Sequence, residues 1–291
     1  MTPEGAFEDV ARPRLALADL ASRTYAVVNE QPLLYFGMAA FVGIALVLME
    51  LPLILSDMLK KIINMGPDWH YVWKSLEVAG NIAEGFLGTA VYGAIAYIVF
   101  QRLKKGREVL LDQALSQLQK QIAPLIGIAL IAVLMVSVDL FIVLAAPMGL
   151  LIIIVLKPFL VLLILLVCSA FLPVVPACVV EERGFLDSLA RSLELTRGMR
   201  MPIFFKICVV YAMVLLLSYA LHFVVFIHLL SESYTHNEAF LILWSLCYKL
   251  VSNMISVFLS VLTVIVYCDL ADYKDRVQPV ECSAKPEGTA I

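Results

Sequence analysis

Five charged residues stand inside long apolar stretches of the sequence, and they are its first candidates for chemistry. The group consists of Glu50, Glu84, Asp139, Lys157 and Lys249. A charge in the hydrocarbon core of a membrane costs about 2.5–3.5 kcal/mol at mid-helix, so each one needs a partner or a purpose. At about 1.5 Å per helical residue, all five fall in the same half of a membrane. The sequence therefore predicts an intramembrane polar cluster.

Two roles fit this cluster. An outward-opening polar cavity that binds a headgroup, an ion or a small solute would make the chain a small transporter or channel subunit. Ion pairs that only fix the packing of helices would make the charges structural, and we favour this interpretation. Asp139 and Lys157 each lie nine residues from Met148, so a hairpin that turns there would bring them to similar depth.

The sequence lacks the motifs of the enzyme classes that such residues could serve. It contains no HExxH, no Cys/His cluster with zinc spacing, no GxSxG and no phosphate-binding glycine loop. Glu181-Glu182-Arg183 is similar to the start of the EExxxR motif of CAAX-type proteases, but residue 186 is Leu186. We therefore expect no catalytic residues, no cofactor and no bound metal; a membrane enzyme that acts on lipids is the least favoured alternative.

Composition decides which solvent surrounds the chain. Its 291 residues are 62% hydrophobic and only 15% charged, with a mean hydropathy of +0.93. Soluble domains approach about 25% charged residues, so water is not the main solvent here. The formal net charge is −3, and the basic residues form short clusters between apolar runs. A nucleic-acid partner would find no continuous basic surface, and we exclude that class.

Six apolar stretches are each long enough to cross a bilayer about 30 Å thick as a helix. They cover residues 33–57, 79–101, 122–146, 149–178, 203–229 and 239–269. The third and fourth are separated only by Ala146-Pro147-Met148-Gly149, which predicts a tight hairpin. The sequence thus predicts an all-α polytopic membrane bundle of six transmembrane helices, with short amphipathic cytoplasmic helices.

The basic residues predict the orientation of this bundle. Fifteen of the 21 lysines and arginines lie before the first stretch, after the second, after the fourth or after the sixth. The other three connections contain only Lys60, Lys61 and Lys74. By the positive-inside rule, both ends of the chain are then cytoplasmic, and the polar cluster lies in the outer half of the membrane. We expect a cytoplasmic segment at 1–32, a membrane domain at 33–270 and a flexible cytoplasmic tail at 271–291.

Three short amphipathic segments precede the first, third and fifth stretches. They begin at residues 17, 111 and 185, each has an aspartate near its start, and Pro32, Pro124 or Pro202 follows 12 to 15 residues after that aspartate. One interpretation is a three-fold repeat of an interfacial helix plus a transmembrane hairpin. The other is that unrelated amphipathic helices share a composition.

The clearest of these segments is residues 185–197, a candidate cytoplasmic interaction helix. Its apolar side carries Phe185, Leu186, Leu189 and Leu193. Its charged residues are Asp187, Arg191, Glu194 and Arg197. Gly198 would stop the helix. Such a helix either lies in the headgroup layer with its arginines near anionic lipid or caps the bundle.

Two segments carry a resemblance to a known family. After the valine-rich end of the fourth stretch come Glu181, Gly184, a short Ser/Ala-Leu helix, Arg191-Ser192 and Leu195-Thr196-Arg197-Gly198. The sixth stretch ends in Tyr267-Cys268-Asp269-Leu270, which is similar to a Tyr-x-Asp-Leu closing motif. Together with the six-stretch layout, these segments resemble the YciC-like proteins and the membrane domain of some glycerophosphoryl diester phosphodiesterases.

The resemblance implies a multi-pass protein of the bacterial cytoplasmic (inner) membrane, from a group sometimes linked to phospholipid-headgroup metabolism. It brings no catalytic residues, and we expect no phosphodiesterase domain because that barrel typically needs about 250 residues. The leading hypothesis is a non-enzymatic module that contacts membrane lipids or a protein partner. Gly85, Thr89 and Gly93, at intervals of four residues, predict close helix packing within the chain or, alternatively, in a homo-oligomer.

Overall fold

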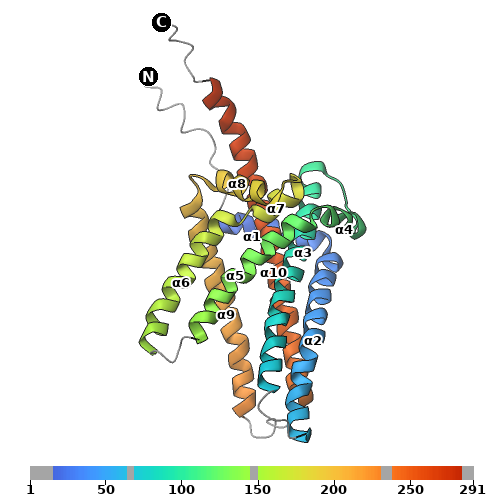
Figure 1. Cartoon of the computed structure of the whole chain (residues 1–291). Coiled ribbons are helices and arrows are strands. Elements are labelled where there is room, and N and C mark those ends of the chain that lie inside the picture. The colour runs from blue at the N-terminus through green and yellow to red at the C-terminus, as the bar shows by residue number, and fades with distance from the viewer. Residues whose placement is uncertain (1–15, 64–68, 145–149, 231–237, 284–291) are drawn as a thin grey trace.

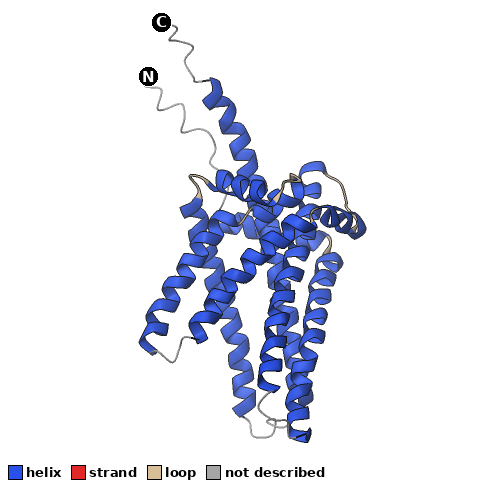
Figure 2. Cartoon of the chain, viewed as in Figure 1, coloured by secondary structure: helices blue, strands red, loops and turns tan. Residues whose placement is uncertain are grey.

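The structure, a computed structural model, describes residues 16–63, 69–144, 150–230 and 238–283. Its regular structure is entirely helical in these ranges, which confirms the predicted all-α class (Figures 1 and 2). Six helices are long: α2 (Pro32–Ile63), α3 (Trp69–Lys105), α5 (Ile122–Leu144), α6 (Leu150–Phe171), α9 (Arg200–Leu230) and α10 (Glu238–Ser283). Four are short: α1 (Leu17–Glu30), α4 (Leu111–Lys120), α7 (Val174–Val180) and α8 (Phe185–Thr196).

Each long helix covers one of the six apolar stretches, because a continuous apolar run is most stable as one helix when it is buried or in lipid. The bounds differ from the prediction at α3, which begins at Trp69, before the predicted residue 79, and in the fourth stretch, which is divided into α6 and α7 at Pro173. Length and apolar composition mark three described segments as able to cross a membrane: Ile82–Lys105, Val161–Val180 and Leu246–Arg276. Helix α1 and the first part of α2 also pass this test when they are taken together, although the two are bent by 91° relative to each other. If this bent pair is one span, the number of candidate spans rises to four. Three to four membrane-spanning helices are therefore supported in the described part, and six remains a prediction.

Helix α10 is longer than the sequence predicted. We expected a flexible tail from residue 271, whereas α10 continues as helix to Ser283 and projects beyond the other helices (Figure 1). No glycine or proline lies between Glu238 and Gln278, so nothing local ends the helix where the apolar run stops. An ion pair between Lys104 of α3 and Asp272 also holds the first turn of this extension against the bundle.

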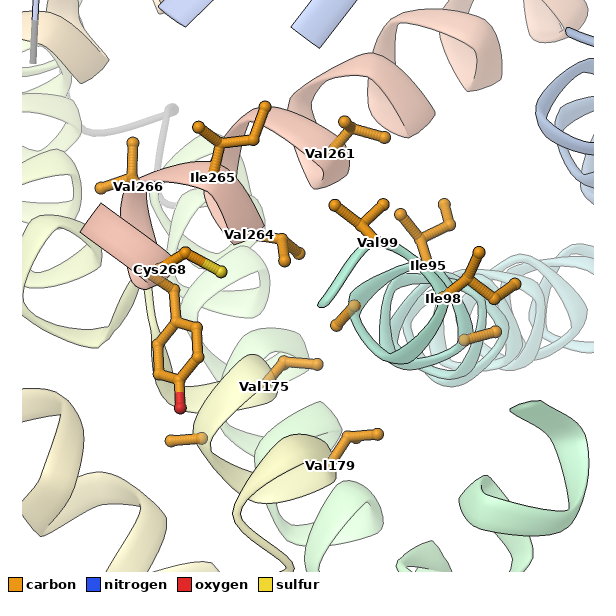
Figure 3. Packing of buried hydrophobic residues seen from close by; sticks show 14 of the residues in the cluster. Ile95, Ile98, Val99, Val175, Val179, Val261, Val264, Ile265, Val266 and Cys268 are labelled. Carbon is orange, nitrogen blue, oxygen red and sulfur yellow. The ribbon is translucent and has the colours of Figure 1, made fainter. Parts of the chain in front are cut away.

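The long helices pack in two groups. Helices α2, α3 and α10 all contact one another, whereas α9 makes its main contacts with α6. Helix α5 contacts α3 as well as α6, and α7 packs against α3, so these two helices join the groups. The most deeply buried side chains lie where α3, α7 and α10 meet (Figure 3), and include Ile95, Ile98, Val99, Val175, Val179, Val261 and Val264.

Small residues allow α3 to approach its neighbours closely. A Cβ atom at Gly93 would lie 2.6 Å from Leu118 Cδ2 of α4, and one at Gly85 would lie 2.7 Å from Val133 Cγ2 of α5. Both distances are shorter than a carbon contact allows. Gly85 and Gly93 therefore serve packing within the chain, the first of the two interpretations of their spacing.

The four short helices lie together at one end of the long ones, which we call the short-helix end (Figure 1). The three predicted amphipathic segments are present here as α1, α4 and α8, and each precedes a pair of long helices. Helix α8 ends at Thr196, and Gly198, the predicted stop, follows two residues later with a positive φ of +85° that favours glycine. The order short, long, long occurs three times, with α7 as an addition; common ancestry of the three units remains a prediction.

Candidate functional site

A charged network at the short-helix end is the most highly connected polar site among the described residues. Its centre is Glu181, which follows α7 directly. Tyr267 of α10 donates a 2.7 Å hydrogen bond to Glu181 Oε1, and Arg191 Nε of α8 donates to the same oxygen over 3.1 Å. Arg183 forms an ion pair with the other oxygen, Oε2. We call Glu181, Arg183, Arg191 and Tyr267 the Glu181 network; it connects the α7–α8 turn to both α8 and α10.

The turn between α7 and α8 is what positions Glu181. The chain reverses over Glu181–Gly184, and Glu182 takes a left-handed conformation with φ of 54°, which is uncommon for a residue other than glycine. Gln117 Nε2 of α4 donates a 2.9 Å hydrogen bond to Glu182 Oε1. This conformation is held by the contact of the Glu182 carboxylate with α4 on one side and by the Glu181 network on the other.

The electrostatics of Glu181 follow from these contacts. Burial alone would raise the pKa of its carboxyl group, but the hydrogen bonds from Tyr267 and Arg191 and the nearby charges of Arg191 and Arg183 lower the pKa overall. A carboxylate with a lowered pKa and its oxygens occupied by donors is a poor general base. The network is therefore suited to hold helices in register rather than to move protons.

Further ion pairs continue the network around the short-helix end. Arg23 of α1 binds Asp269 of α10 with two parallel hydrogen bonds, 2.8 Å from Nη1 and 3.0 Å from Nη2. Arg102 of α3 pairs with Glu30 at the end of α1. Since Arg–carboxylate pairs with two parallel bonds fix orientation as well as distance, α1 is held at a defined position against α10.

The buried face of α8 overlaps the predicted apolar side only in part, since Phe185, Leu189 and Leu193 are half-buried. Phe185 and Leu189 do pack at the edge of the core, but Leu186 is 73% exposed. The centre of the buried face consists of Ser188, Ser192, Leu195 and Thr196. Ser192 Oγ donates a 2.7 Å hydrogen bond to the carbonyl oxygen of Ala170, in the last turn of α6. The last carbonyls of a helix lack backbone donors, so a hydroxyl face satisfies them better than a leucine face would.

The four charged residues of the candidate interaction helix have different surroundings. Asp187, Glu194 and Arg197 are exposed. Arg191 is largely buried, with 15% of its side chain exposed, and its guanidinium also contacts Glu194 over 3.1 Å. Arg191 thus bonds to residues of the chain itself, and its largely buried position does not favour the predicted contact with lipid.

The predicted intramembrane cluster is described only in part. Glu84 is exposed on α3 and Lys249 is half-buried on α10, two helices that pack against each other. The side chains of Glu50, Asp139 and Lys157 fall outside the described residues, so the similar depth of Asp139 and Lys157 remains a prediction. Across the described ranges, no group of three or more His, Cys, Asp and Glu side chains is placed to hold a metal ion.

Sequence reasoning did not find the Glu181 network, although its members were singled out for other reasons. Glu181 and Arg183 were considered as a fragment of a protease motif, and Glu181 and Tyr267 also for a family resemblance. A usable signal was present: charged or hydroxyl residues that stand directly at the end of an apolar run must be solvated or paired where the helices emerge. Glu181 and Asp269 both occupy such positions.

Comparison with known proteins adds no further constraint on the site. No protein-family model, curated protein or solved structure matches the chain. The contacts described above are therefore the basis for the function proposed next.

Proposed function

We propose that the chain is a non-enzymatic, multi-pass membrane module whose short helices contact the lipids of one leaflet. The observation that carries this proposal is an apolar stripe on α4. Leu111 and Leu115, one turn apart, are 41% and 49% exposed, and the preceding Leu110 is 68% exposed. Leucines in this arrangement would be unfavourable in water and favourable at the boundary of a lipid leaflet.

The faces of α4 fit such a position. Ala114, Gln117 and Leu118 are buried against the bundle, and the leucine stripe lies beside that buried face. Ser116 and Lys120 lie on the remaining side of the helix and are exposed. A helix with one face on protein, one apolar stripe and one polar face has the pattern of an interfacial helix.

The charges around α4 favour anionic lipid over neutral lipid. Lys105 at the end of α3, Arg107 in the connection that follows and Lys120 at the end of α4 are exposed. No acidic partner contacts these three side chains in the described part of the chain. Cations near a leaflet surface contribute about 1 kcal/mol each to the binding of anionic lipid. Helix α4 therefore supports a lipid-facing role better than α8, whose arginine is used in the Glu181 network.

The full arrangement that we propose has six membrane crossings with the short-helix end in the cytoplasm. The described chain begins and ends at the short-helix end, as an even number of crossings requires (Figure 1). The excess of lysine and arginine at this end supports its cytoplasmic placement. The resemblance to six-span inner-membrane proteins supports the bacterial cytoplasmic membrane as the location.

Fluorescence quenching by brominated lipids tests the leaflet contact of α4. In liposomes, the tryptophan of a Leu115→Trp variant should be quenched by lipids brominated near the headgroup, after the signal of the native tryptophans is subtracted. The matched control is Ser116→Trp, one residue away on the polar side, which should be quenched much less. Equal quenching of the two variants would contradict the proposal, and reproducible solute flux in proteoliposomes would favour a transporter instead.

A further inference from the structure

An apolar cavity of about 200 Å³ lies between α1, α9 and α10, beside the point where α6 ends. It exists because α9 packs mainly against α6, which leaves space between α9 and α10 below α1. Leu20 of α1, Ile207 and Val210 of α9 and Leu262 of α10 are among its lining residues. Tyr211, another lining residue, is 37% exposed, so the cavity reaches the outer surface of the bundle.

Lys206 is the one charged side chain among the residues that line this cavity. It is half-buried, and within the described part of the chain it forms no ion pair or hydrogen bond. A partly desolvated ammonium group beside apolar surface is unfavourable until it meets an anion. The hydroxyl group of Thr263, which also lines the cavity, already donates a 2.7 Å hydrogen bond to the carbonyl oxygen of Leu259.

The position of Lys206 along α9 suits a headgroup contact. It lies six residues after Arg200, where α9 begins, which corresponds to about 9 Å along the helix axis. A lysine at that depth can extend its charged end toward the headgroup layer while its methylene groups stay in the apolar region. The apolar lining thus lies at the depth of a lipid acyl chain. The ammonium group of Lys206 lies at the depth of the phosphate in the same leaflet.

The lining of the cavity indicates the chemistry of its occupant. Apart from Lys206 and the hydroxyl groups of Tyr211 and Thr263, the lining side chains are apolar. An occupant with a long apolar part and one anionic end matches such a lining, and a phospholipid has both. We infer that the cavity holds one acyl chain of an anionic phospholipid, with the phosphate paired to Lys206. This inference rests on the membrane placement proposed above and names one lipid site within it.

Native mass spectrometry of the purified full-length protein tests the site. The protein is equilibrated with equal amounts of phosphatidylglycerol and phosphatidylcholine that carry identical acyl chains. We expect the wild type to retain the anionic lipid about fivefold over the zwitterionic one, the ratio that one cation near a leaflet supplies. Lys206→Gln should abolish this preference, and Lys206→Arg should keep it.

A variant that fills the cavity provides a second test of the site. Val210→Trp places an indole in the cavity and should reduce retention of the anionic lipid to the level of the zwitterionic one. Val209→Trp is the matched control, since Val209 is 49% exposed and does not line the cavity. The unfolding temperature of each variant shows whether it folds. If Val210→Trp does not fold, the smaller substitution Val210→Phe takes its place.

The inference requires both Lys206→Gln and the cavity-filling variant to lose the preference. Absence of a preference in the wild type, or a loss in only one of these two variants, overturns it. These outcomes are separate from failure of the proposed function. A Leu115→Trp protein that is still quenched by brominated lipid leaves the leaflet contact intact, whatever the result at Lys206.

Discussion

Tyr267 and Glu181 are 86 residues apart in the sequence and are joined by a 2.7 Å hydrogen bond, in which the tyrosine hydroxyl donates to the carboxylate. The bond connects the last long helix, α10, to the turn that follows α7. Arg191 of α8 donates to the same carboxylate oxygen. Three segments that emerge from the bundle at different points of the chain therefore meet at one acidic side chain.

Removal of the tyrosine hydroxyl should loosen this junction. Tyr267→Phe leaves Glu181 with its two arginines but without one charge-assisted hydrogen bond, and such bonds contribute about 1.5–3 kcal/mol. We expect a lower unfolding temperature in detergent, measured by tryptophan fluorescence. The control Tyr219→Phe changes a tyrosine that is 71% exposed and should leave the unfolding temperature unchanged. Equal temperatures for wild type and Tyr267→Phe would show that the bond contributes nothing.

Stability should fall in acid because of Glu181. The folded state lowers the pKa of this carboxyl group below its ordinary value of 4.5, so the folded state binds the proton less readily than the unfolded state. The stabilisation is present above the ordinary pKa and is lost as the pH falls through the lowered value. Glu181→Gln should be less stable than wild type at pH 7, and the difference should shrink as the pH falls below about 4. Unfolding temperatures of both proteins from pH 7 to pH 3 test this; a difference that grows in acid would contradict it.

The pair of Arg23 and Asp269 should show a measurable coupling. A double-mutant cycle with Arg23→Ala and Asp269→Ala isolates the interaction, for which we expect about 0.5–1 kcal/mol because Arg23 is partly exposed. A second cycle with Arg23→Ala and Asp19→Ala serves as the control. Asp19 lies 3.8 Å from Arg23 in a single contact, against the two bonds of 2.8 and 3.0 Å to Asp269, so its coupling should be smaller. The reverse order of the two couplings would contradict the geometry.

The close approach at Gly93 should not tolerate a larger side chain. Gly93→Val would place its Cβ 2.6 Å from Leu118 Cδ2 of α4, and overpacking of this kind costs about 1–3 kcal/mol. Gly88→Val is the matched control on the same helix, because a Cβ at Gly88 meets nothing within 4 Å. We expect a lower unfolding temperature for Gly93→Val alone. Equal effects of the two substitutions would mean that α3 and α4 are not in close contact.

The proposed topology predicts the side of the membrane on which each connection lies. Reporter proteins fused to the two ends of the chain should both report the cytoplasm, since the described chain begins and ends at the short-helix end (Figure 1). A reporter inserted at residues 145–149 should report the opposite side. Fusions that place the two ends in different compartments would contradict an even number of crossings.

The sequence by itself determined the elements of this fold. Runs of apolar residues predicted the positions of the six long helices but not all of their ends, and amphipathic patterns at helical spacing predicted α1, α4 and α8. Gly198 was also predicted to stop α8, which ends at Thr196, two residues before it. These features depend on interactions between residues a few positions apart, such as helix periodicity and the left-handed conformation that glycine accepts, so they can be read locally.

Only the tertiary structure decided which partners these elements have. Helix α8 buries Ser192 and Thr196 rather than Leu186, because both hydroxyls donate to the carbonyl oxygen of Ala170 at the end of α6, which no local pattern reveals. The carboxylate of Glu181 meets Tyr267 through the packing of α7 and α8 against α10. Hydrogen bonds and ion pairs at the end of a bundle depend on which helices emerge side by side, and that arrangement is set by contacts between residues distant in the chain.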